Sequence, residues 1–270
     1  MDVRPGSLDR ALEALADRPV PAWDVRRHYL GSPDRVLRYL LVLDTINFSF
    51  WGGTAGGYNQ LAERLRDLFR EGDELAEGAR LAHVTAERLR ELLGDFPMLD
   101  ERAAALRELA RNGFAGLVQP SAVATASALA GRLSSYRDVA VYQGREVPLL
   151  KRAQILPADL HGAGVASFGD LADLTCFPDY KLPQLLRHLG ALVYSEELAR
   201  RVDDWRELAP GEPAEVEIRA STVVCVERLR EALAARGRDL LSIEVDWLLW
   251  DLSQQVYPMR PYHRVRTVFY

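Results

Sequence analysis

The chain has 270 residues, of which 48% are hydrophobic, and a formal net charge of −5 at pH 7. The length fits one large domain or two small ones, and the acidic balance argues against a binder of long nucleic acid. Because there is no apolar run of membrane-spanning length, no signal peptide and only two cysteines, we expect a soluble cytoplasmic protein without a metal, a cofactor, a membrane contact or an obligate protein partner.

Helical periodicity dominates the first half of the chain. Helices are predicted at residues 9–16, 60–69, 75–93, 101–111 and 120–135. The buried run at 36–44 is too short for periodicity to distinguish a helix from a strand. The glycines that follow the segment TINFSFWGG indicate a loop.

The second half continues in the same style after a small hairpin, which is predicted around Gly144. Residues 151–156 begin a helix or a buried connection, and 161–169 form a glycine-rich loop. Further helices are predicted at 182–193, 195–205, 215–235 and 243–255, and Gly190 is expected to interrupt the first of these without ending it. The pattern indicates a mainly α protein, a single helical domain over residues 1–270 in one or two lobes, with at most a short β-hairpin.

An aspartate stands just before the central helix that begins near Leu182. Pro183 suits the first helical turn, and free N–H groups at a helix N-terminus favour an anion. The pattern alone favours Asp179 as a helix cap. The alternative is a catalytic carboxylate between the rings of Phe177 and Tyr180, which together could hold a flat ring.

The last helix carries two acids on an otherwise apolar pattern. Trp247 and Asp251 are four residues apart and share a helical face, and Asp246 and Trp250 form the neighbouring pair. Such acids are unfavourable unless they are paired or functional. One solvent-facing acid and one salt bridge is the equally weighted alternative.

Other candidates are weaker. Asn47 and Phe48 could form a ligand wall, although an aromatic core patch with a turn-capping Asn is the favoured interpretation. His28 is a possible ligand contact, with an ordinary loop histidine favoured. Suitable phosphate donors are Lys151, His263 and Arg264, although a solvated basic face is the usual explanation for any one of them. The chain lacks the GxGxxG, GxxxxGK[ST], HExxH, CxxC and GxSxG motifs.

Several segments occur in one order between residues 36 and 270 and together resemble one family. They are DTINFSFW, KRAQIL, LTCFPDYKLPQLLRHLGALVYS, EIRASTVVCVE, VDWLLWD and HRVRTVFY. They resemble the queuosine salvage proteins, which are queuosine 5′-phosphate N-glycosylases. The family pattern F-A-D-Y-R-x-P-Q is similar to residues 177–184, with Pro178 and Lys181 as departures, and the family often has Tyr where this chain has Trp247.

The resemblance implies a helical fold similar to that of DNA glycosylases. It also implies hydrolysis of queuosine 5′-monophosphate to queuine and ribose 5-phosphate, after which the base would re-enter tRNA through a separate enzyme. A carboxylate beneath the sugar would stabilise or attack the positive charge at C1′, and we assign this role to Asp179. Because the base has carbon in place of N7, help for the leaving group must come through its other edges.

Queuine carries a cationic amine, so acids are expected around the base. We expect Asp246 and Asp251 to be these acids, and Asp246 is also a catalytic candidate. Phe177 and Trp247 are expected to stack on the base. The other expected substrate contacts are Tyr180, Asn47, Phe48 and His28, and those expected at the 5′-phosphate are Lys151, His263 and Arg264.

Two other hypotheses stand beside this one. A DNA or RNA base-excision glycosylase of similar helical fold would need a basic groove and usually a helix-hairpin-helix, and both the acidic charge and the missing motif argue against it. In a non-catalytic nucleoside-binding helical module, Asp179 would be only a helix cap.

Overall fold

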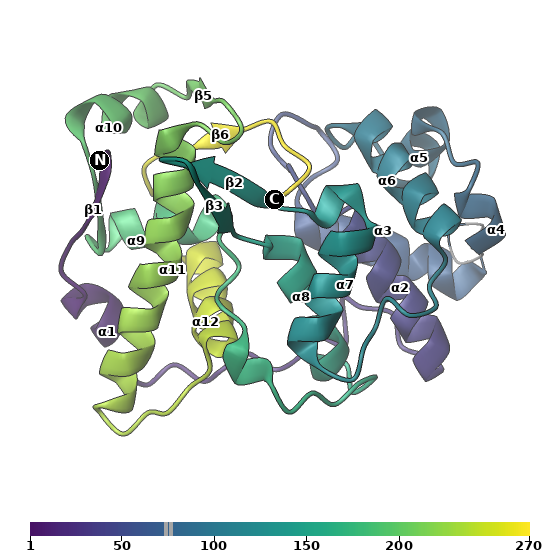
Figure 1. Cartoon of the computed structure of the whole chain (residues 1–270), viewed down its shortest axis with the longest axis horizontal. Coiled ribbons are helices and arrows are strands. Elements are labelled where there is room, and N and C mark those ends of the chain that lie inside the picture. Colours follow the sequence, from purple (N-terminus) through teal and green to yellow (C-terminus); the bar gives the residue numbers. More distant parts are fainter. Residues whose placement is uncertain (73–74, 76–77) are drawn as a thin grey trace. The chain divides into compact units, whose positions relative to one another are not determined.

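The computed structural model describes residues 1–72, 75 and 78–270, which are mainly helical with short strands in two-stranded sheets (Figure 1). This confirms the predicted mainly α class. The chain forms two compact units: unit 1 comprises Met1–Pro21, Val139–Lys151 and Leu171–Thr267, and unit 2 comprises Ala22–Asp138, Arg152–Asp170 and Val268–Tyr270. A single functional domain over the whole chain stays a prediction. Within the described ranges, no helix has both the length and the apolar character needed to cross a bilayer.

Unit 1 is organised around helix α11 (Pro213–Ala234), which packs against α1 (Asp9–Leu15), α9 (Lys181–His188) and α12 (Ser242–Gln255) (Figure 1). Pro213 occupies the first turn of α11, where its missing N–H leaves no hydrogen bond unmade. The remaining elements of unit 1 are α10 (Glu196–Asp203), a 3₁₀ turn (Leu171–Asp173), β1 (Val3–Pro5), β2 (Val139–Tyr142), β3 (Arg145–Pro148), β4 (Leu192–Tyr194), β5 (Glu207–Leu208) and β6 (Arg264–Val265).

The predicted hairpin is present as the antiparallel pair β2–β3. Its two-residue loop, Gln143 and Gly144, has φ values of 50° and 76°, as the tight turns that match strand twist require. Two further pairs, antiparallel β1–β4 and parallel β5–β6, were not anticipated. Strands this short are not long enough to show an alternation of apolar and polar residues, and the strands with which they pair are distant in sequence.

Unit 2 packs α6 (Leu99–Asn112) against α2 (Pro33–Thr45), α4 (Gly78–Leu81) and α5 (Ala86–Leu93), and α3 (Tyr58–Glu71) against α2 and α5. Its other helices are α7 (Ala122–Arg132), a 3₁₀ turn (Ser134–Tyr136) and α8 (Lys151–Gly162), whose first residue is assigned to unit 1. Residues 36–44, which periodicity could not assign, lie in α2. Residues 39–45 are all buried, so this part of α2 shows no periodicity of its own.

The prediction of one continuous helix over residues 75–93 is wrong, because α4 ends at Leu81 and α5 begins at Ala86. The Thr85 side chain accepts a hydrogen bond from the Arg88 N–H and starts a new helix. The part of this prediction that falls on residues 76 and 77 lies outside the described residues.

The prediction that Gly190 does not end the central helix is also wrong. Helix α9 ends at His188, and Gly190 has φ +81°. The Ala191 N–H bonds to the Leu186 carbonyl at 2.8 Å and the Gly190 N–H to the Arg187 carbonyl at 3.1 Å, the pairing of a Schellman motif. The chain then turns into β4, so Val193 lies in a strand.

We expect Gly190→Ala to destabilise the protein by about 1 kcal/mol, because a residue with a Cβ is disfavoured at this positive φ. A Cβ there meets no atom within 4 Å, so the cost is conformational. The free energy of unfolding in urea measures it. Gly131→Ala is the control: Gly131 lies in α7 with equally open space, and this change should stabilise. Equal effects of the two changes would contradict the assignment.

Candidate active site

Three consecutive residues before α9 are each tied to a different helix of unit 1. The Phe177 N–H donates to Asp246 Oδ2 on α12 at 2.7 Å, and the Pro178 carbonyl accepts from Arg219 Nε on α11 at 2.9 Å. Asp179 Oδ1 accepts from the N–H groups of Lys181 and Leu182, at 2.7 and 3.1 Å. These hydrogen bonds hold the irregular backbone before α9 in place. The Asp179 side chain caps the first turn of α9, as the cap interpretation predicts.

The two predicted catalytic acids have different surroundings. Asp246 is 4% exposed, whereas Asp179 is half-buried. Burial raises the pKa of Asp246 well above its ordinary value and the nearby Asp179 raises it further, while the Phe177 N–H and the Lys151 charge lower it. Asp246 is therefore protonated over a wider pH range than an ordinary aspartate.

A buried ion pair on α11 supports the same segment. Arg219 Nη1 lies 3.3 Å from Glu215 Oε1, one helical turn away, and both side chains are almost fully buried. The guanidinium can therefore donate to Pro178 while its charge is compensated inside the protein. Sequence reasoning missed this pair, although the i, i+4 spacing of an acid and an arginine was a readable signal.

Aromatic and cationic side chains gather beside Asp179. The Tyr180 and Tyr262 rings lie 4.7 Å apart between centroids, and the Trp205 ring meets Tyr262 edge-on at 5.4 Å. The Arg264 guanidinium lies 4.0 Å above the Trp205 ring, and the Lys181 ammonium lies 5.8 Å from the Tyr262 ring. Two cations are thereby held against aromatic rings.

The remaining predicted residues of unit 1 are distributed around α12 and the C-terminal segment. Trp247 is half-buried beside Asp246 in the sequence of α12. Asp251 forms an ion pair with Arg18 at 2.8 Å and is 39% exposed, in contrast to the buried Asp246. His263 is buried, and burial together with the Arg219 charge lowers its pKa to about 3, which leaves the ring neutral.

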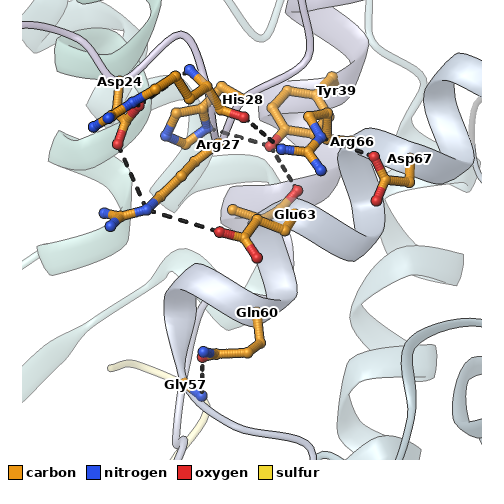
Figure 2. A network of polar contacts seen from close by, with 11 residues as sticks. Asp24, Arg27, His28, Tyr39, Gly57, Gln60, Glu63, Arg66 and Asp67 are labelled. Atoms are coloured by element: carbon orange, nitrogen blue, oxygen red, sulfur yellow. Dashed lines mark hydrogen bonds and ion pairs between the residues drawn. The ribbon is translucent and has the colours of Figure 1, made fainter.

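His28 belongs to unit 2 and is held by a specific network (Figure 2). Its ring stacks on Trp23 at 4.2 Å, and Nδ1 lies 3.2 Å from the Tyr39 hydroxyl, which donates to the Ala62 carbonyl at 3.1 Å. Burial lowers the His28 pKa to about 4, so the ring is neutral. Because the Tyr39 proton is committed to Ala62, Nδ1 carries the hydrogen and Nε2 is an acceptor.

Asn47 and Phe48 also lie in unit 2, on the irregular segment after α2. The Phe48 ring lies close to two buried guanidinium groups, with its centroid 4.5 Å from that of Arg102 and 4.9 Å from that of Arg152. Arg102 donates to the carbonyls of Ile46, Phe48 and Ser49, and Arg152 to those of Asp44 and Thr45. Phe48 is thus fully buried, which favours the core interpretation of its ring.

The structure assigns the candidates to both units. Asp179, Asp246, Phe177 and Lys151 are linked by hydrogen bonds or charge interactions in unit 1, and Tyr180 and Arg264 belong to the neighbouring aromatic cluster. His28, Asn47 and Phe48 are placed in unit 2.

We expect Asp246→Asn to remove a pH dependence of stability. An Asn oxygen can still accept from Phe177. In the parent, the stabilisation from the neutral carboxyl is fully present below the unfolded pKa of 3.8 and is lost as pH rises towards the raised folded pKa. The parent should therefore lose up to about 1.4 kcal/mol per pH unit relative to the variant. Denaturation of both proteins between pH 4 and 8 measures this, and parallel pH profiles would refute it.

Arg219→Met should cost about 3–5 kcal/mol, because it leaves Glu215 buried without its cation. Arg219→Met/Glu215→Gln should recover part of the loss. Arg230→Met is the matched control on the same helix: its ion pair with Glu227 is about one-third exposed, and such pairs contribute less than about 1 kcal/mol. Urea unfolding distinguishes these cases, and similar losses for Arg219→Met and Arg230→Met would contradict the buried pair.

Comparison with known proteins places this chain among relatives that match nearly all of it. A protein 41% identical from Sphaerobacter thermophilus matches over 96% of this chain and 89% of its own length. Relatives from Dictyostelium discoideum, at 36%, and Mus musculus, at 31%, match over 86% and 89% of this chain and 78% and 83% of their own. Each of the three is named queuosine 5′-phosphate N-glycosylase/hydrolase.

The family model described as queuosine salvage protein matches residues 27–270. The match includes every residue discussed above as a site candidate. It also agrees with the resemblance drawn from the sequence segments, which begins at residue 36. The chain belongs to the queuosine salvage protein family.

Proposed function

We propose that this protein hydrolyses the N-glycosidic bond of queuosine 5′-monophosphate and releases queuine and ribose 5-phosphate. Family membership and the names of the relatives support this activity. The observation that carries the mechanism is the placement of Asp179, whose carboxylate is fixed at the N-terminus of α9 by two backbone N–H groups.

Asp179 is the group that meets the sugar. Cleavage of the bond builds positive charge at C1′ and on the ring oxygen, and a fixed carboxylate stabilises this charge or attacks C1′. Both capping hydrogen bonds engage Oδ1, and Oδ2 is the oxygen that we assign to the substrate. The cap is therefore part of the mechanism, since it orients the carboxylate without consuming both oxygens.

Asp246 is the group that assists departure of the base. Queuine has carbon where guanine has N7, so the usual site of purine protonation is missing. A carboxyl whose pKa is raised by burial can donate a hydrogen bond or a proton to another edge of the base. With Oδ2 accepting from Phe177, Oδ1 carries the proton. Two carboxyl groups in different surroundings are the usual division between acid and nucleophile.

The remaining contacts follow from the same chemistry. Trp247, next to Asp246 on α12, provides a stacking surface, and Asp251 provides charge for the queuine amine. His28 presents Nε2 as an acceptor, and Asn47 lies on the segment that the two buried arginines hold. These four assignments are proposals that a ligand-bound structure tests directly.

Asp179→Asn should reduce queuine release by about a hundredfold to a thousandfold, because it removes the charge that stabilises the sugar cation. An Asn side chain can still cap α9, so the free energy of unfolding should change by less than about 1 kcal/mol. The assay is chromatographic detection of queuine from queuosine 5′-monophosphate with purified protein.

Asp239→Asn, an exposed acid between α11 and α12, is the control and should retain the parent rate. Release of queuine by Asp179→Asn at the parent rate would remove Asp179 from the mechanism. Absence of queuine release by the parent protein would refute the proposed activity itself.

A further inference from the structure

The chain uses its two kinds of cationic side chain very unequally. Thirty-four residues are lysine or arginine, and only two of these, Lys151 and Lys181, are lysines. Both lie in unit 1, and each interacts electrostatically with one proposed catalytic acid: Lys151 with Asp246, and Lys181 with Asp179. This chain otherwise uses arginine for its cations. A lysine beside a proposed catalytic acid is therefore a candidate for a specific role.

Lys181 is held at the start of α9, two residues after Asp179. Its Nζ donates to Gln184 Oε1 at 3.0 Å, and the Gln184 amide in turn donates to the Arg260 carbonyl at 2.7 Å. Burial lowers the Lys181 pKa, and the Asp179 charge raises it. The ammonium has three N–H donors, and the Gln184 contact uses one. Lys181 is thus a pre-positioned cation supported by a neutral amide.

A second cation is held nearby by the same aromatic cluster. The Tyr262 hydroxyl is hydrogen-bonded to the Arg264 side chain, and the Tyr262 ring lies close to the Lys181 ammonium. The parallel pairing of β6 with β5 sets Arg264 opposite Glu207, and its guanidinium lies on the Trp205 ring. Tyr262 therefore links the two cations through its hydroxyl and its ring.

We propose that Lys181, Tyr262 and Arg264 form the subsite for the 5′-phosphate of the substrate. The proposal rests on the proposed function and on the role of Asp179 at C1′. Because the 5′-phosphate is joined to the same ribose ring, its receptor must lie beside the acid under C1′, as Lys181 does. A phosphate monoester carries nearly two negative charges at pH 7, which suits an ammonium and a guanidinium.

This subsite differs from the set expected from the sequence, in which Lys151 and His263 accompanied Arg264. Lys151 interacts with the buried Asp246, where its charge lowers the pKa of that acid. His263 is neutral because burial and the Arg219 charge lower its pKa to about 3. Neither therefore offers the free positive charge that Lys181 brings to the side of Asp179.

The test compares two substrates, queuosine 5′-monophosphate and the unphosphorylated nucleoside queuosine, in the parent and in Lys181→Met. Methionine keeps the length of the side chain and removes the charge. The ratio of kcat/KM for the nucleotide to that for the nucleoside should fall by about tenfold to a hundredfold, the usual effect of a lost charge-assisted hydrogen bond. Lys181→Arg should restore most of the ratio.

Arg236→Met removes an exposed cation at the end of α11 and is the matched control, with the parent ratio expected. Inhibition by ribose 5-phosphate gives an independent measurement, and its inhibition constant should rise at least tenfold in Lys181→Met and in Arg264→Met. These variants serve as alternatives if one of them does not fold.

Equal losses on nucleotide and nucleoside, with an unchanged constant for ribose 5-phosphate, would overturn the subsite while leaving the hydrolase activity standing. A parent protein that releases queuine from neither substrate would overturn both proposals. A ratio that falls in Lys181→Met but not in Arg236→Met supports the subsite.

Discussion

The hydrogen bond from the Phe177 N–H to the buried Asp246 carboxyl is the contact on which the proposed site depends. It joins the irregular chain before α9 to helix α12, and it places Asp246 near the charge of Asp179. That proximity adds to the effect of burial in raising the pKa of Asp246 and favours its neutral form. The donor itself lowers the pKa of Asp246, and burial, which raises it, is the largest effect.

Much of unit 1 could be predicted from the sequence because its signals are local. The acid before a helix N-terminus, the hairpin around Gly144 and the long apolar pattern of α11 each depend on neighbouring residues. The end of α9 also has a local signal, Gly190. The prediction was wrong because a glycine in a helical pattern can either interrupt the helix or end it. The six residues from Leu186 to Ala191 close a Schellman motif, and that decides the outcome.

The acids of α12 show where local signals stop. Periodicity marks Asp246 and Asp251 as equally unusual, and only packing separates a buried carboxyl from one that pairs with Arg18 at the surface. The arginines around Phe48 are a stronger case. Arg102 reaches a carbonyl 56 residues earlier in the chain, and Arg152 reaches one 108 residues earlier. No pattern within a window of a helix or two contains that information.

The scarcity of lysine has a practical consequence for chemical labelling. Acylating reagents that select primary amines have only two side-chain targets in this chain, apart from its terminal amine. Lys151 is 6% exposed, so reagents have little access to it, whereas Lys181 is half-buried and its lowered pKa increases the share of the nucleophilic free amine. A single covalent probe at Lys181 would therefore report from the residue two positions after Asp179, and its rate of attachment would record whether that position is covered.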